Sequence, residues 1–397
     1  MKYFQMHDFD FKGKRTIVRV DFNVPLENGR ITDDKRIQAA LPTIRHILDN
    51  SGSVILMSHL GRPKGEGPEK GLKMDPVAKR LSELLSKDVR KLDDCIGDDV
   101  KKAAESLQPG EILLLENLRF HKEEKKGDEE FAKKLASLAD LYVNDAFGTC
   151  HRSHASVAQI TNYLPSAAGF LVQKEIDMIS PVIDSPKRPY IAILGGAKIS
   201  DKIRLIESIL PKVDRLLLGG AMIFTFYKAA GFEIGKSLVE EDFLKDALRI
   251  QKEAGEKLVL PIDVVVADKF DADAKAENVF VEEMPAGWIG LDIGEASIKL
   301  FQTMIANAKT VVWNGPMGVF EFERFATGTL EVARSVAELK DATTIIGGGD
   351  SASAVAKMGL ADKMTHVSTG GGATLKFFES GTLPALECLE KNHEKFS

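Results

Sequence analysis

The sequence has few cysteines, no long apolar run and no excess of basic charge. Its three cysteines, Cys95, Cys150 and Cys388, are widely spaced and form no Cys-x-x-Cys pair. This pattern argues against a disulfide scaffold or a cysteine zinc site, and it is typical of thiols in a reducing cytosol. No apolar run approaches the roughly 20 residues of a membrane helix, and the N-terminal residues MKYFQMHDFDFKGK lack the apolar core of a signal peptide. We therefore expect a cytoplasmic protein with no membrane partner.

The charge and the length narrow the class further. A formal net charge of −6 argues against a nucleic-acid-binding protein, so any anion site must be a local cluster. A chain of 397 residues favours two domains. We place their boundary near Ser185, where a helix predicted at about 168–184 meets SPKRP (185–189), because two prolines stop a helix. The charge-rich stretch KEEKKGDEE (122–130) is interpreted as a solvated loop that leads into a helix.

Short runs rich in Val, Ile and Leu alternate with segments of helical spacing along the chain. The predicted strands lie in 16–25, 53–61, 111–120, 141–148, 190–197, 215–222, 258–267, 310–316, 344–349 and 366–372. Helical spacing marks 33–50, 128–139, 296–308 and 328–339. Continuous apolar strands alternating with helices predict parallel sheets covered on both faces, which is a doubly wound α/β fold. Sheets of this type bind ligands at the carboxyl ends of their strands.

The first half of the chain places polar and basic side chains at or after predicted strand ends. They are Asp21, Asn23, Arg36, His59, Arg62, Arg119 and Arg152. Guanidinium groups bind carboxylate and phosphate through paired hydrogen bonds, so arginines converging from several strand ends suit a small anion. Any one of them alone is also explained as a solvated surface charge. His59, His151 and His154 leave a metal site as an alternative, although no carboxylate or cysteine lies at matching ligand spacing.

The second half contains three glycine-rich turns between a predicted strand and a helix, which are LGGAKISDK (194–202), GGGDSASA (347–354) and STGGGAT (368–374). Such turns expose backbone N–H groups and the positive end of the helix dipole, which suits phosphate. Lys198 and Lys202 would share a helix face if the helix has begun there. Asp350 could hold the magnesium ion that accompanies a nucleotide, or it could be a plain N-cap.

Two nucleotide-binding motifs give different results. The P-loop pattern is absent, so a P-loop kinase is excluded. Gly347, Gly349 and Ala352 match the dinucleotide pattern G-x-G-x-x-[GA], which keeps a dehydrogenase as an alternative enzyme class. That match is weak, because no acidic residue ends a second strand about 20 positions later.

Eight segments, in order along the chain, resemble the phosphoglycerate kinase family. They are RVDFNVP (19–25), SHLGRP (58–63), LLENLRF (114–120), YVNDAFGTCHRSHAS (142–156), LGGAKISDK (194–202), VVWNGPMGVFE (311–321), IGGGDSASA (346–354) and HVSTGGGAT (366–374). The resemblance implies two Rossmann-like doubly wound domains joined by a helix, with a cleft between them. It implies a 3-phosphoglycerate domain at 1–185, a nucleotide domain at 186–376, and a tail at 377–397 that packs back on the first domain.

The resemblance also implies a reaction and the residues that carry it. The reaction is glycolytic phosphoryl transfer from 1,3-bisphosphoglycerate to ADP, by a monomer that uses Mg²⁺ with ADP or ATP. The substrate would be held by Asp21, Asn23, Arg36, His59, Arg62, Arg119 and Arg152. The nucleotide would be contacted by Gly196, Lys202, Gly219, Gly220, Gly290, Asn314, Glu321, Gly349, Asp350 and Ser351, with the metal on Asp350. Catalysis would fall to Arg36, Lys198, Lys202, Gly349 and Gly372. A binding protein that had lost the activity would lack some of these catalytic residues, and all of them are present.

Overall fold

The computed structural model describes residues 2–397, which form two compact units. Unit 1 comprises Met1–Asp177 and Thr382–Ser397, and unit 2 comprises Met178–Gly381. The division between the two units falls between Asp177 and Met178, inside helix α6 (Phe170–Asp184). It lies upstream of the boundary that the sequence predicts near Ser185.

Unit 1 is built on a seven-stranded sheet in which every neighbouring pair is parallel. Its strands, in spatial order, are β1 (Phe4–Gln5), β9 (Ser166–Ala168), β8 (Leu141–Asp145), β2 (Arg15–Val20), β5 (Ser53–Met57), β7 (Ile112–Leu114) and β6 (Arg90–Lys91). A separate two-stranded hairpin joins β3 (Leu26–Glu27) to β4 (Arg30–Ile31). Strands β5 and β8 are buried along their whole length, and β2 is buried from Thr16 onward, because helices cover both faces.

Two apolar cores lie on the two faces of this sheet. One core holds α1 (Lys35–Asp49) and α2 (Asp75–Leu85) against Val18 and Leu56. The other holds α3 (Asp98–Glu105) and α5 (Glu129–Ala136) against Ile17 and Ile55. Successive strand residues therefore point to opposite cores, as the pleat requires.

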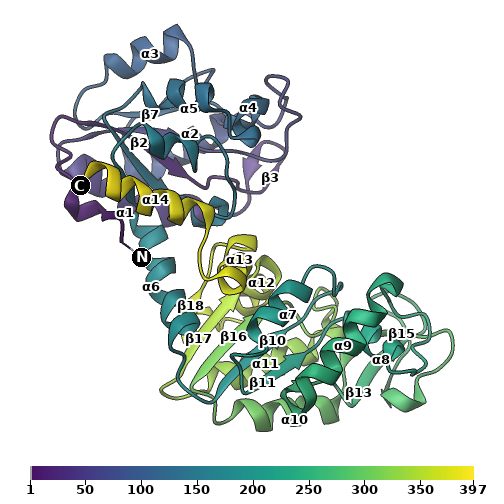
Figure 1. Ribbon diagram of the computed structural model, residues 1–397. Helices are drawn as coiled ribbons and strands as arrows, with labels where there is room; N and C mark the ends of the chain where they lie inside the picture. The colour runs from purple at the N-terminus through teal and green to yellow at the C-terminus, as the bar shows by residue number, and fades with distance from the viewer. Residues whose placement is uncertain (1) are drawn as a thin grey trace. The chain divides into compact units, whose positions relative to one another are not determined.

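The C-terminal helix α14 (Pro384–Phe396) packs on unit 1, beside elements from the start of the chain (Figure 1). The side chain of Asn392, which is 3% exposed, fixes the helix there. Its amide nitrogen donates to the carbonyl oxygens of Thr161 (2.6 Å) and Leu164 (2.8 Å), and its oxygen accepts from the Ser166 N–H (2.9 Å).

Replacing Asn392 with alanine is expected to lower the free energy of unfolding of unit 1 by roughly 2–4 kcal/mol, because it leaves the Thr161 carbonyl oxygen and the Ser166 N–H without these bonds and leaves the Leu164 carbonyl oxygen with the Ser166 hydroxyl alone. Urea denaturation followed by circular dichroism measures the change. Asn50→Ala is the matched control, since the exposed Asn50 side chain makes one bond, to the His46 carbonyl oxygen, and its loss should cost much less. Equal losses in the two variants would contradict the anchoring role of Asn392.

Unit 2 has a six-stranded parallel sheet and a smaller antiparallel sheet. The parallel strands, in spatial order, are β12 (Leu258–Val259), β11 (Arg215–Leu218), β10 (Tyr190–Leu194), β16 (Thr310–Asn314), β17 (Thr343–Gly347) and β18 (His366–Val367). The helices are α7 (Ile203–Ile209), α8 (Ile223–Ala229), α9 (Leu244–Ala254), α10 (Glu295–Ile305), α11 (Thr327–Ala337), α12 (Gly349–Lys357) and α13 (Gly372–Ser380). The two main sheets confirm the predicted α/β class with parallel sheets.

The single strand predicted at 258–267 is wrong, because the run divides between the two sheets of unit 2. Leu258–Val259 ends the parallel sheet as β12, while β13 (Asp263–Ala267) pairs with β14 (Ala276–Phe280) and β15 (Ile289–Ile293). Pro261 lies at the break, and a proline has no N–H to continue a ladder. Across residues 2–397, no helix is long and apolar enough to cross a bilayer.

Candidate functional site

The polar residues predicted in the first half of the chain follow four neighbouring strands of unit 1. Asp21 directly follows β2, and His59 lies two residues after β5. Arg119 lies in the short 3-10 helix Leu118–Phe120 that follows β7, and Arg152 follows the turn after β8. The order β8–β2–β5–β7 places all four segments at the carboxyl edge of one parallel sheet.

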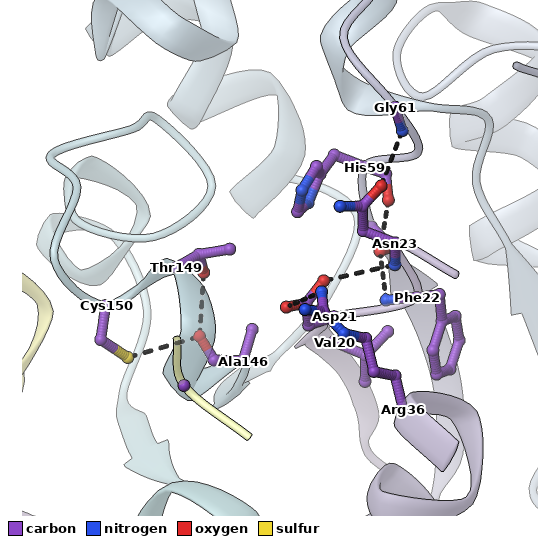
Figure 2. A network of polar contacts seen from close by, with 12 residues as sticks. Val20, Asp21, Phe22, Asn23, Arg36, His59, Gly61, Ala146, Thr149 and Cys150 are labelled. Atoms are coloured by element: carbon purple, nitrogen blue, oxygen red, sulfur yellow. Dashed lines mark hydrogen bonds and ion pairs between the residues drawn. The ribbon is translucent and has the colours of Figure 1, made fainter. Parts of the chain in front are cut away.

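Short polar contacts join the turns after β2 and β5 (Figure 2). The Ser58 hydroxyl accepts from the Phe22 N–H (2.9 Å) and donates to the His59 carbonyl oxygen (3.1 Å). The Asn23 side-chain oxygen accepts from the Gly61 N–H (2.8 Å). These contacts set the two turns at a fixed spacing, so the side chains of Asp21, Asn23 and His59 form one surface.

Two of the predicted arginines contact this surface. Arg36, in the first turn of α1, forms an ion pair with Asp21 at 2.9 Å and keeps 41% of its side chain exposed. Arg119 is buried and donates to the Gly61 carbonyl oxygen (2.7 Å), while its Nε atom has no partner. Arg62 is exposed and Arg152 is half-buried.

The electrostatics of this surface favour an anion. Burial, followed by the charges of Arg152 and Arg19, lowers the pKa of Arg119 to about 10. Burial, followed by the positive charges of Arg19, Arg119, Arg152 and Arg36, holds the pKa of His59 well below its usual value. Positive charges close enough to disfavour one another gain most from a bound carboxylate or phosphate.

The other two histidines of this region contact side chains of unit 1. The Arg152 Nε–H donates to His151 Nε2 at 3.1 Å, and burial, together with the Arg152 charge, lowers the pKa of His151 to about 4. His154 Nδ1 lies 3.6 Å from a carboxylate oxygen of Glu124. Within residues 2–397, the one group with metal-like spacing is Asp94, Cys95 and His121, so the metal alternative for His59, His151 and His154 gains no support.

In unit 2, two glycine-rich turns open helices as the sequence predicts. Gly348 (φ 88°) and Gly371 (φ 52°) are the N-caps, and Gly349 and Gly372 are the first residues of α12 and α13. The positive φ angles suit glycine, and the first N–H groups of each helix have no partner within the helix. Asp350 is the second residue of α12 and makes no capping hydrogen bond, so its interpretation as a plain N-cap is wrong.

A pocket of about 350 Å³ lies at these helix starts. Its lining includes Gly196, Lys198, Lys202, Asn314, Gly349, Asp350, Ser351 and Gly372, all of which the sequence predicts, and also Asp201, which it does not. Lys202 donates to the side-chain oxygen of Asn314, whose amide nitrogen is buried and has no partner. An unpaired buried donor beside two lysines and two helix starts indicates a site for an anion with several oxygens.

The helix after the first glycine turn begins later than Lys198. Helix α7 starts at Ile203 with Lys202 as its N-cap, so Lys198 and Lys202 line the pocket from a turn and not from one helix face. Burial lowers the pKa of Lys202. Ser351 is fully buried, and its hydroxyl accepts from the Gly315 N–H at 2.6 Å.

A second, larger pocket of about 690 Å³ adjoins the first and shares Gly196 and Asp350 with it. Gly220, Gly290 and Glu321, also predicted, line it. Gly219 lies under Met317, where an added Cβ would come within 2.5 Å of the Met317 sulfur. A Cβ on Gly290 would meet the Phe224 ring at 1.9 Å, so only glycine leaves room for that ring.

The sequence did not predict the apolar lining of this pocket. It includes Phe224, Leu238, Phe270, Ile289, Leu291, Met317, Val319 and Phe322. Leu238 and Phe270 are 45% and 61% exposed, which is unusual for such large apolar side chains. A wide apolar slot that ends at a polar, glycine-rich pocket suits a flat ring attached to phosphates.

Comparisons with known proteins identify the family of this chain. Residues 6–381 match the family model described as phosphoglycerate kinase. A chloroplastic phosphoglycerate kinase of Volvox carteri is 58% identical over 390 residues, which cover 96% of this chain and 84% of that protein. The cytosolic phosphoglycerate kinase of Triticum aestivum is 58% identical over 389 residues, which cover 96% of each.

Solved structures give the same result. Phosphoglycerate kinase from Coxiella burnetii superposes with a TM-score of 0.89 at 39% identity, and all of both chains is covered. The enzyme from Pyrococcus horikoshii gives a TM-score of 0.86 at 34% identity and covers 99% of this chain and all of its own. This chain belongs to the phosphoglycerate kinase family.

Proposed function

We propose that unit 1 binds 3-phosphoglycerate and that unit 2 binds ADP or ATP with magnesium. The reaction is the family's glycolytic phosphotransfer, in which 1,3-bisphosphoglycerate and ADP give reversibly 3-phosphoglycerate and ATP. The observation that carries the assignment is the contrast between the two sites. Unit 1 presents a compact cluster of guanidinium groups, whereas the unit 2 anion pocket opens into an apolar slot wide enough for a base.

The substrate in unit 1 carries a carboxylate and a phosphate, and the cluster offers matching donors. Arg36, Arg62, Arg119 and Arg152 would supply paired N–H groups to these oxygens. Asn23 and His59 would add single hydrogen bonds, and Asp21 would accept from the substrate hydroxyl. Since Asp21 also pairs with Arg36, it would hold that guanidinium in place until the substrate binds.

The nucleotide in unit 2 would place its base in the apolar slot and its phosphates at the helix starts. Gly196, Gly219, Gly220, Gly290 and Glu321 would border the base and ribose. Lys202, Asn314, Ser351 and the N–H groups of Gly349 and Gly372 would bind phosphate oxygens. The residues present also fit magnesium, because Asp350 is an exposed carboxylate in the same pocket for which no ion pair is described. When bound, the ion would neutralise part of the phosphate charge.

The transfer step makes few demands on covalent chemistry. A β-phosphate oxygen of ADP attacks the acyl phosphate, and the protein contributes position and positive charge. We assign to Arg36 and Lys198 the positive charge that stabilises the phosphoryl group during its transfer. Water, which competes as an acceptor, is excluded in the state in which both ligands are brought together. Lys202 and the N–H groups of Gly349 and Gly372 stabilise the oxygens that stay on the nucleotide.

A coupled assay of ATP and 3-phosphoglycerate consumption, with and without magnesium, tests the function. Magnesium-dependent turnover is expected. A folded protein that binds both ligands and shows no turnover would contradict the assignment and indicate a binding protein. Monomeric state, cytoplasmic location and the absence of nucleic-acid or membrane partners stay predictions, to be checked by light scattering and cell fractionation.

Replacing Asp350 with asparagine is expected to weaken the binding of Mg-ADP by roughly tenfold or more, because a charged ligand to a hard cation is lost. Isothermal titration calorimetry with Mg-ADP and separately with 3-phosphoglycerate measures this change. The affinity for 3-phosphoglycerate should stay within about twofold. Asp362→Asn, which changes an exposed carboxylate of unit 2 that lines neither the anion pocket nor the apolar slot, is the control. If Asp350→Asn kept the magnesium requirement of the wild type unchanged, Asp350 would not be a ligand of the metal.

A further inference from the structure

A buried arginine lies directly behind the anion surface of unit 1. Arg19, next to last in β2, is 0% exposed. Its Nε donates to the Ser156 hydroxyl (2.9 Å), one terminal nitrogen donates to the Val20 carbonyl oxygen, and the other lies 3.2 Å from His59 Nδ1. A fully buried guanidinium needs a counter-charge, and no carboxylate is among these three partners.

The counter-charge comes through Ser156 from Glu124, which is also 0% exposed. The Ser156 hydroxyl donates to one Glu124 oxygen (2.6 Å), and the Ser156 N–H donates to the other (3.0 Å). Burial alone would raise the pKa of Glu124, but the interaction with His154, the charge of Arg19 and the hydrogen bond from Ser156 lower it below its usual value. The residues therefore form one buried chain, Glu124–Ser156–Arg19–His59, that ends at the anion surface.

The chain determines the protonation of His59. A guanidinium has only donors, so the nitrogen facing it must accept. His59 Nδ1 therefore carries a lone pair, and the ring is neutral with its proton on Nε2. Ser58 also holds the His59 backbone beside Phe22, so neither the ring nor its main chain is free to reorient. A neutral ring in this tautomer offers one N–H donor to an anionic oxygen.

We propose that Arg19, Ser156 and Glu124 are positioning residues that fix His59 as an Nε2–H donor to 3-phosphoglycerate. The inference rests on the proposed binding of that substrate to unit 1. None of the three needs to touch the ligand. They act by keeping Nδ1, the acceptor of the His59 ring, bonded to Arg19, so that the Nε2–H donor is the group presented to the ligand.

Ser156→Ala is the main test, because it cuts the link between Arg19 and Glu124 and keeps both charges. We expect the KM for 3-phosphoglycerate to rise about 3- to 10-fold, because the hydrogen bond from His59 to the ligand is weakened and not removed. The KM for ATP and kcat should stay within about twofold. Arg19→Lys is the second variant and should act in the same direction, since an ammonium lacks the planar fork that reaches Ser156 and His59 together. Ser166→Ala, which removes another fully buried hydroxyl of unit 1, bonded to the Leu164 carbonyl oxygen, is the control and should leave both KM values unchanged.

Nitrogen-15 NMR of the histidine rings reads the tautomer on the intact, folded protein, and the signal missing in His59→Gln assigns His59. The wild type should show an unprotonated Nδ1 and a protonated Nε2 at neutral pH, and both variants should show a mixture. A wild type that binds 3-phosphoglycerate with Nδ1 protonated or with a cationic ring would overturn this inference alone. The positioning role would also be wrong if both variants kept the tautomer and the KM of the wild type. A wild type that does not bind 3-phosphoglycerate at all would overturn the proposed function and this inference with it.

Discussion

Replacing Lys198 with alanine is expected to lower kcat by roughly 10³-fold, while the KM for ATP changes by less than about threefold. The structure gives the reason for this asymmetry. Lys198 is exposed at the wall of the unit 2 pocket, and no hydrogen bond or ion pair is described for its ammonium group. Lys202, by contrast, is half-buried and bonded to Asn314, so it suits oxygens that stay on the nucleotide. A charge that meets the phosphoryl group only in transit stabilises the transition state more than either ground state.

Steady-state kinetics in both directions measure the effect, with Mg-ADP affinity taken separately from calorimetry. Lys299→Ala, which removes an exposed lysine from α10 on the same unit and away from both pockets, controls for net charge and should change kcat by less than about twofold. A Lys198→Ala enzyme that lost only nucleotide affinity and kept its kcat would assign Lys198 to ground-state binding.

The parallel sheets could be predicted from the sequence because their central strands are buried on both faces. Runs such as Tyr190–Leu194 and Thr310–Asn314 are buried without interruption, and few other elements share that pattern. The antiparallel sheet of unit 2 could not be predicted in the same way. Its strand Ala276–Phe280 has the sequence Ala-Glu-Asn-Val-Phe and is largely exposed, so it carries no comparable apolar signal.

The polar site residues could be predicted because strand ends of parallel sheets meet at one edge, whatever the details of the turns. The buried residues that support these side chains could not be predicted. Glu124 lies in a stretch of nine mostly charged residues, interpreted from sequence as a solvated loop, yet it is 0% exposed in α4 (Lys122–Lys126). Its burial depends on Ser156 and Arg19, which are distant in sequence and whose pairing only the fold reveals. Arg19 itself lies inside a predicted strand, and no sequence pattern there indicates that it is a buried cation that positions His59.

The apolar slot of unit 2 could not be predicted for a different reason. Phe270 lies in the connection between β13 and β14, and Leu238 lies in an irregular segment after α8, so neither belongs to a periodic pattern. Their signal is exposure, since both are large, apolar and partly open to solvent. Exposure is a property of the folded chain, which is why the glycines of this pocket could be predicted and its apolar walls could not.

Arg36→Ala is expected to lower kcat by roughly 10³-fold and to raise the KM for 3-phosphoglycerate by no more than about tenfold. Arg36 is one of several arginines at the anion surface, so the others retain much of the ground-state affinity. It differs from Arg119 in being 41% exposed and held by one ion pair, to Asp21, and not by burial. A guanidinium with that freedom can follow a phosphoryl group in transit, whereas a buried one stays with the oxygens that do not move.

Arg36→Lys separates charge from geometry, because lysine keeps the charge and loses the planar fork. It should recover part of kcat, and Arg45→Ala, which removes another arginine of α1 bonded only to the Leu84 carbonyl oxygen, should leave kcat unchanged. Calorimetry with 3-phosphoglycerate alone gives the ground-state affinity directly. If Arg36→Ala abolished that binding and left kcat intact at saturation, Arg36 would be a binding residue like its neighbours, and the charge on the transferred group would have to come from unit 2 alone.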